Sequence, residues 1–356
     1  MTRRTPLQEL ALLRLVAQRL VGGGAPTPAQ AVGGLLAAQG QDLPGVLTSI
    51  ALRTAGRSVD EVRAACDAGL LVRSWPMRGT LHVVLPEDLG WLRELTTARL
   101  VAGAARRRAA LELDERVLER ARELALAALA GGGRLSREAL YGVWARGGVG
   151  TDGQRGYHLL WHIAQTGSVC FGPFDGREQL VVRCDEWIAG SRVWEREAAL
   201  VELARRYFRG HGPATVKDLA RWVGLPLGEV RRGLADAAGD LAQRQVDGVT
   251  YYLDPAVVDG LAAHRREAGG VLLLPGFDEF VLGYADRSAC LPAEFAERIV
   301  PGGNGMFRAT VVAGGQVVGV WRREGRGAAR AVEATPFTAF TAAIRQGVVR
   351  AYDALP

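Results

Sequence analysis

The sequence predicts an α+β protein made of three tandem winged-helix units followed by a C-terminal domain of short strands. Runs with helical apolar spacing are followed three times by a pair of strand-like runs, so the order helix, helix, hairpin recurs although the residues do not. From about residue 266 the pattern changes to short apolar runs separated by glycine-rich turns, which is typical of a small β-barrel or a curled sheet. We therefore expect domains at 1–105, 106–192, 193–265 and 266–356.

The composition is that of a globular protein without a membrane span. The chain has 356 residues, of which 48% are apolar and 23% charged, and this length allows several domains with their own cores. No run of 18 apolar residues occurs. The twin arginine Arg3-Arg4 is followed by an amphipathic helix instead of an apolar segment, so we expect no export signal and a cytoplasmic protein.

The first unit begins with helices separated by an unusual polar turn. Residues 7–21 carry a helical apolar stripe, and Thr27 followed by Pro28 predicts the N-cap and first residue of a second helix. That helix ends near Gln39, and Pro44 starts a third. The residues Gln39-Gly40-Gln41-Asp42 therefore form the elbow between the second and third helices, where Asn, Ser or a single Gly would suffice for a turn.

A hairpin completes the first unit. Ser58 to Glu61 has the sequence of a capping box and opens a helix that ends at Gly69, a residue suited to a left-handed C-cap. Strand-like runs at 70–75 and 80–84 follow and are joined through Pro76-Met77-Arg78-Gly79. Helices followed by a hairpin predict a winged helix.

The second and third units repeat this order. In the third unit, Thr215 to Asp218 caps a helix that ends at Gly224. Asp247-Gly248 is the sequence of a tight hairpin turn. The remaining elements of the two units are expected at 135–143, 157–165, 169–172 and 179–182, and at 227–238, 241–246 and 249–253.

The C-terminal domain is expected to be a small β-barrel or curled sheet closed by a helix. Its glycine-rich turns include 302–305 and 314–315, and the last helix spans 337–352. Short strands are expected at 272–274, 280–282, 307–312, 317–321 and 330–334.

The charge and the metal-binding residue types give weak functional signals. A net charge of +6 favours an anionic partner. All lysine and arginine positions except Lys217 are arginine, and a GC-rich genome, which favours arginine codons, is the alternative explanation for this basic composition. The four cysteines lack a C-x-x-C motif and are expected as reduced core residues. His158 and His162 share a helix face but lack further ligands, so we expect no metal and no cofactor.

Several segments together resemble one known family. They span most of the chain in a fixed order and are Gln39-Gly40-Gln41, Arg73-Ser74-Trp75-Pro76-Met77-Arg78-Gly79-Thr80-Leu81-His82, His211-Gly212-Pro213-Ala214-Thr215 with Trp222, Leu274-Pro275-Gly276-Phe277-Asp278-Glu279, and Gly319-Val320-Trp321. These segments resemble the motifs of the winged-helix DNA glycosylase superfamily. Gln39-Gly40-Gln41 is similar to the Gln-x-Gln motif of its AlkZ-like branch, with glycine in the middle where a larger apolar residue stands in relatives. It differs from the Gln-x-Asp of the sister branch.

The resemblance implies a monofunctional DNA glycosylase that removes alkylated purines and leaves an abasic site. Members of the AlkZ-like branch are associated with self-resistance to azinomycin-like crosslinking agents and with unhooking of N7-linked guanines. The resemblance also implies three winged helices in a C-shaped arrangement, supported by a C-terminal barrel. The expected partner is double-stranded DNA with alkylated purines such as N7-alkylguanine.

The two glutamines suit such a substrate. An N7-alkylated purine already carries a positive charge and leaves without protonation, so the enzyme has only to position a water and tolerate a positively charged sugar. Gln39 and Gln41 offer carbonyl acceptors and amide donors that hold a water from two sides and direct dipoles at the sugar. Asp42 is the stronger base, but its place two residues before Pro44 favours a helix cap over catalysis.

Three residues of the first hairpin are candidates for DNA contact. Arg73 and Arg78 can bind phosphate bidentately, and His82 can hold the lesion or a phosphate. Packing of the hairpin is the alternative for Arg73. Asp278 and Glu279 are expected to make a structural contact between the C-terminal domain and the winged helices.

Two other functions compete with catalysis. One is a non-catalytic tandem winged-helix DNA-binding protein, such as a regulator, and the other is a sensor of the genotoxin with the C-terminal domain as its pocket. Regulators usually bind as symmetric dimers, and since no dimerisation zipper is apparent we expect a monomer. A lyase needs an amine for a Schiff base, and Lys217, in a first helix turn, is expected to meet solvent or phosphate. We therefore expect no strand cleavage beyond the abasic site.

Overall fold

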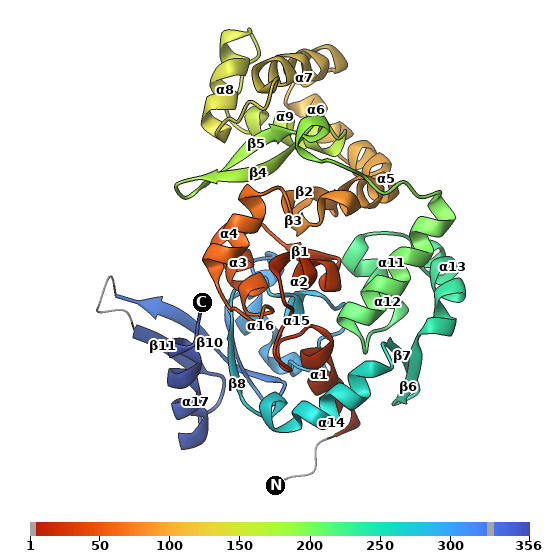
Figure 1. Cartoon of the computed structure of the whole chain (residues 1–356), viewed down its shortest axis with the longest axis vertical. Coiled ribbons are helices and arrows are strands. Elements are labelled where there is room, and N and C mark those ends of the chain that lie inside the picture. Colours follow the sequence, from red (N-terminus) through yellow and green to blue (C-terminus); the bar gives the residue numbers. More distant parts are fainter. Residues whose placement is uncertain (1–4, 326–330) are drawn as a thin grey trace. The chain divides into compact units, whose positions relative to one another are not determined.

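The chain folds into two compact units, drawn in the computed structural model of Figure 1. The first unit combines the segment up to Val62 with Leu200–Pro356, and the second consists of Arg63–Ala199. The chain therefore leaves the first unit and returns to it. The boundaries fall within the helices α4 (Val59–Asp67) and α11 (Arg196–His211).

The structure describes residues 5–325 and 331–356. The twin arginine Arg3-Arg4 and Arg330, the first residue of an expected strand, lie outside the described residues. The expected mixture of helices and antiparallel sheets is confirmed. Within the described residues no helix is long and apolar enough to cross a membrane.

The first unit begins with helices and one short strand around the polar elbow. These are α1 (Pro6–Ala17), α2 (Pro28–Leu35), β1 (Ala37–Gln39) and α3 (Leu43–Ala51). Thr27 caps α2 by accepting a hydrogen bond from the Gln30 amide, as its sequence predicts. Leu36 then adopts a φ of 68°, which ends the helix and directs the chain into β1. The helix α1 is buried from Leu10 to Leu15 and contributes to the main apolar cluster of the unit.

A helix–helix–hairpin segment follows after the chain returns to the first unit. Its elements are α12 (Val216–Val223), α13 (Leu227–Ala237), the short helix η1 (Ala238–Asp240), β6 (Ala242–Val246) and β7 (Val249–Leu253). Thr215 and Asp218 form the expected capping box, and Gly224 is the left-handed C-cap. Asp247 and Gly248 both have positive φ, as the hairpin turn requires. The helix α14 (Ala256–Ala268) comes next and packs on α1.

The C-terminal part carries a four-stranded antiparallel sheet in the order β11-β10-β9-β8. The strands are β8 (Val271–Leu274), β9 (Thr310–Ala313), β10 (Gln316–Glu324) and β11 (Ala331–Pro336). The helix α17 (Ala342–Asp353) packs on β8 and is capped by Thr341. The connection from β8 to β9 contains α15 (Glu279–Leu282), η2 (Ala293–Phe295), α16 (Ala296–Ile299) and η3 (Pro301–Gly303).

This sheet differs from the small barrel that its sequence suggests. Over the described residues its strands do not close into a barrel. The expected strand at 280–282 is a turn of helix, because Asp278 accepts from the Phe280 amide and begins α15 there. The expected strand at 307–312 starts only at Thr310, and the last helix starts at Ala342 instead of residue 337.

The second unit joins the first two expected hairpins into one sheet. The strands β2 (Val72–Met77), β3 (Thr80–Val84), β4 (Val169–Asp175) and β5 (Glu178–Arg183) lie in the order β3-β2-β4-β5. Arg73 of β2 pairs with Phe171 of β4. The core of this unit contains Trp75, Trp144 and Trp161. Its helices are α5 (Pro86–Gly103), α6 (Ala105–Ala110), α7 (Glu115–Leu129), α8 (Arg137–Arg146), α9 (Arg155–Gln165) and α10 (Cys184–Trp187).

Two glycines of α13 test how closely this helix packs. A Cβ on Gly233 would lie 2.3 Å from the Leu200 carbonyl oxygen, whereas a Cβ on Gly228 would meet nothing within 4 Å. We expect Gly233→Ala to lower the free energy of unfolding by about 1–3 kcal/mol, because backbone atoms of α11 must move. Gly228→Ala, the matched control, should leave it unchanged or raise it by up to about 1 kcal/mol. Urea unfolding measures both, and equal effects would contradict the close contact.

Candidate active site

The structure brings the two glutamines of the elbow into direct contact. The Gln39 Nε2 donates to Gln41 Oε1 at 2.5 Å, and the Gln41 backbone amide donates to Gln39 Oε1 at 2.8 Å. Gln39 ends the buried strand β1 and is only 5% exposed, whereas Gln41 is exposed. The Gln39 side chain is thus anchored inside the unit and holds the Gln41 side chain at the surface, where Gln41 can meet a substrate or a water.

A buried carboxylate lies directly behind the elbow. Glu279 is 1% exposed, and its Oε1 accepts from the Gln39 backbone amide at 3.0 Å. Its Oε2 accepts from Trp222 Nε1 at 2.9 Å and lies 3.4 Å from His211 Nε2. Three N–H groups around two oxygens form the environment that suits an ionised carboxylate. Glu279 therefore connects β1 to α11 and α12.

The aromatic residues around Glu279 fix the orientation of its partners. The His211 ring stacks on Tyr207 with centroids 4.7 Å apart, and its backbone carbonyl accepts from the Tyr284 hydroxyl at 2.7 Å. Tyr207 in turn donates to the Gly283 carbonyl at 2.8 Å. Burial raises the pKa of both tyrosines above the usual range, so their hydroxyls remain donors at neutral pH.

The neighbouring Asp278 ties the next helix to the same segment. Its two carboxylate oxygens accept from Arg53 Nη1 and Nη2, each at 2.8 Å, in a bidentate pair that is fully buried. Ser49 Oγ also donates to Asp278, at 2.7 Å. Arg53 Nη2 further donates to Gln18 of α1. Because Ser49 lies in α3 and Arg53 follows it, the helix that leaves the elbow is held by Asp278.

Asp42 occupies the N-cap position of α3 but does not make the expected cap hydrogen bond. Its backbone is extended, its carbonyl accepts from the Val46 amide, and its side chain forms no capping bond. A Cβ on Gly45 would lie 2.4 Å from Asp42 Oδ2, so Gly45 leaves the space that this carboxylate occupies. The side-chain cap predicted from the sequence is wrong, while its position at the start of the helix is right.

The three candidates from the first hairpin lie in the second unit. Arg73 is buried, donates to Gln179 Oε1 at 2.8 Å and lies over the Phe171 ring, and burial lowers the pKa of its guanidinium to about 10. These are the contacts of a packed side chain. Arg78 is half-buried and its Nη2 lies 3.1 Å from His82 Nε2. His82 Nδ1 donates to the Thr80 carbonyl, which leaves Nε2 as the acceptor for Arg78.

Metal-binding residue types do not gather among the described residues, where no cluster of three or more His, Cys, Asp or Glu could hold an ion. Burial lowers the pKa of both His158 and His162. The four cysteines are free thiols. Sequence reasoning noticed the segments around His211 and Glu279 but missed that they converge on Gln39.

Comparisons with known proteins agree in pointing to one family. A family model described as "DNA glycosylase AlkZ-like" matches residues 32–355. A curated relative from Streptomyces sahachiroi, the "Interstrand DNA cross-link repair glycosylase", is 27% identical over 318 residues, which cover 83% of this chain and 82% of the relative. The solved structure of Streptomyces sahachiroi DNA glycosylase AlkZ is similar in fold, with a TM-score of 0.79, 23% identity, and coverage of 98% of this chain and 95% of that one.

The Arg53–Asp278 pair predicts a large stability effect. Arg53→Met leaves the buried Asp278 charge without its partner, and we expect the free energy of unfolding to fall by about 3–5 kcal/mol. Arg122→Met removes one partner of an exposed pair with Glu119 and should change it by less than about 1 kcal/mol. Denaturant unfolding of both variants provides the test, and a small effect for Arg53→Met would show that the pair is not needed to hold α3.

Proposed function

We propose, from the premise that this chain belongs to the AlkZ-like family of DNA glycosylases, that Gln39 and Gln41 form its catalytic pair and position the water that attacks the sugar. As a family member the protein is a DNA glycosylase, which hydrolyses N-glycosyl bonds. The observation that carries the proposal is that the Gln39 side chain bonds both the side chain and the backbone amide of Gln41, while a buried carboxylate holds the Gln39 backbone amide.

The proposed substrate is an alkylated purine, such as N7-alkylguanine, in double-stranded DNA. Alkylation at N7 places a positive charge on the base, so the base leaves without a proton donor. The remaining work is to orient water and to stabilise a positively charged sugar, for which neutral amides suffice. The absence of a lysine other than Lys217 in the sequence supports a reaction that stops at the abasic site.

Glu279 supports this chemistry in two ways. Its bond to the Gln39 amide fixes the backbone of the elbow, so the pair does not need to be organised when substrate binds. Its charge also lies behind the amides in a nearly dry environment, where it favours a positive charge on the substrate side. We assign Glu279 as a positioning and electrostatic residue that acts through Gln39.

The name of the Streptomyces sahachiroi relative extends the proposal to crosslinked DNA. We propose that this enzyme also unhooks interstrand crosslinks formed through guanine N7. We further propose that the helix–helix–hairpin segments act as three winged helices. The second, third and C-terminal domains would then begin at residues 106, 193 and 266. Arg78 and His82, which contact each other, and Asp42 are proposed to lie near bound DNA.

Replacing either glutamine tests the catalytic assignment. We expect Gln39→Ala and Gln41→Ala to slow release of N7-methylguanine from a duplex on the order of 10²-fold or more, because a preorganised polar group is lost. Single-turnover assays scored for alkali-labile sites give the rate, and DNA affinity should persist. Gln346→Ala, on the exposed face of α17, is the matched control. Unchanged rates would remove the pair from catalysis, and no base release by the wild type would favour a non-catalytic DNA-binding protein.

Replacing Glu279 separates its charge from its shape. Glu279→Gln keeps the side-chain size but places an amide against three N–H groups, and we expect a fall of about 10²-fold in the single-turnover rate with DNA affinity kept within a few-fold. Trp222→Phe removes one donor only and should cost less than about 10-fold. A Glu279→Gln variant that folds, binds DNA and keeps the wild-type rate would contradict the electrostatic role.

A further inference from the structure

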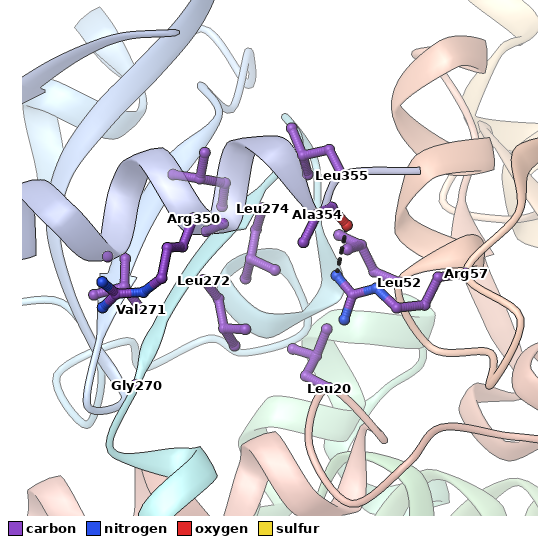
Figure 2. A pocket seen from close by; sticks show the side chains of 13 residues that line it. Leu20, Leu52, Arg57, Gly270, Val271, Leu272, Leu274, Arg350, Ala354 and Leu355 are labelled. Carbon is purple, nitrogen blue, oxygen red and sulfur yellow. Dashed lines mark hydrogen bonds between the residues drawn. The ribbon is translucent and has the colours of Figure 1, made fainter.

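An apolar cavity of about 310 Å³ lies within the first unit, away from the glutamine pair (Figure 2). Six leucines line it, namely Leu20 after α1, Leu52 after α3, Leu272, Leu273 and Leu274 of β8, and Leu355 after α17. The C-terminal end of α17 covers them. Its volume is at the lower end of the range for small-molecule sites, about 300–1,000 Å³.

The cavity exists because several residues of α17 that line it have small side chains or none. At Gly347 the helix touches β8 so closely that a Cβ would lie 2.5 Å from Val271 Cγ2. One and two turns later the lining residues are Ala351 and Ala354, which are too short to fill the space above the leucines. Protein interiors are normally packed to crystal-like density, so this gap leaves apolar surface that a ligand can cover.

Two arginines flank the leucines. Figure 2 shows Arg57 and Arg350 at opposite ends of the cavity. The Arg57 Nη2 donates to the Ala354 carbonyl over a long 3.4 Å, which leaves its other N–H groups for a ligand. Within the described residues neither guanidinium has a carboxylate within 4.0 Å. Arg57 also adopts a φ of 46°, a conformation that residues with a side chain rarely take.

We propose that this cavity binds a small amphipathic carboxylate, with its alkyl chain over the leucines and its carboxylate against Arg57. The alkyl chain gains by covering apolar surface. A planar guanidinium binds a carboxylate through paired hydrogen bonds, and the carbonyl of Ala354 already restricts the Arg57 side chain to the rim. Arg350 limits the other end. The site does not depend on a catalytic role for Gln39 and Gln41.

Calorimetry on the full chain with octanoate and 1-octanol tests the site. We expect saturable one-to-one binding of octanoate, and binding of 1-octanol that is at least roughly tenfold weaker because it lacks the charge. Arg57→Gln should weaken octanoate binding roughly tenfold and leave 1-octanol unchanged. Arg345→Gln, which replaces an arginine of α17 outside the lining, is the matched control. Ala351→Leu should abolish binding of both ligands by filling the cavity.

The possible results separate the parts of the proposal. No saturable octanoate binding would overturn it, as would equal affinity for the two ligands or an Arg57→Gln variant that binds octanoate like the wild type. Wild-type binding by a natively folded Ala351→Leu variant would place the ligand elsewhere and also overturn it. If Ala351→Leu fails to fold, judged by circular dichroism, Ala354→Leu fills the other side of the same cavity and must then abolish binding.

Discussion

The adjacent acids Asp278 and Glu279 are the constraint on which the elbow depends. Each is almost fully buried, and each is satisfied by a different set of donors, Asp278 by Arg53 and Ser49 and Glu279 by Gln39, Trp222 and His211. Breaking either set would leave a buried charge uncompensated, which costs far more than the loss of an ordinary hydrogen bond. One dipeptide thereby fixes both the strand that enters the elbow and the helix that leaves it.

The contacts of this dipeptide are long-range, and this determines when the elbow can form. Glu279 lies 240 residues after Gln39, and the second unit is inserted between them in the sequence. The N-terminal helices alone lack the carboxylate that holds the Gln39 amide. The geometry of the glutamine pair is therefore a property of the complete first unit, which requires the chain to return after Ala199.

Elements that depend on neighbouring residues could be predicted from the sequence, whereas those that depend on long-range contacts could not. The caps at Thr27 and Thr215 and the turn at Asp247-Gly248 depend on neighbouring residues, and all three are found. The apolar run at 280–282 predicts a strand but forms helix, because a short apolar segment does not distinguish a strand from a buried helix. The convergence of His211, Trp222 and Glu279 on Gln39 has no local signature. The roles of Gln39 and Gln41 were inferred from a family motif and remain predictions.

The buried carboxylate of Glu279 favours a neutral amide at the exposed position of Gln41. A carboxylate in place of Gln41 would add a second negative charge to an elbow whose Gln39 backbone amide is already held by the buried Glu279, and like charges repel. Neutral amides avoid this repulsion and still present donors and acceptors. The negative charge stays fixed inside the protein, where substrate binding does not have to reorganise it.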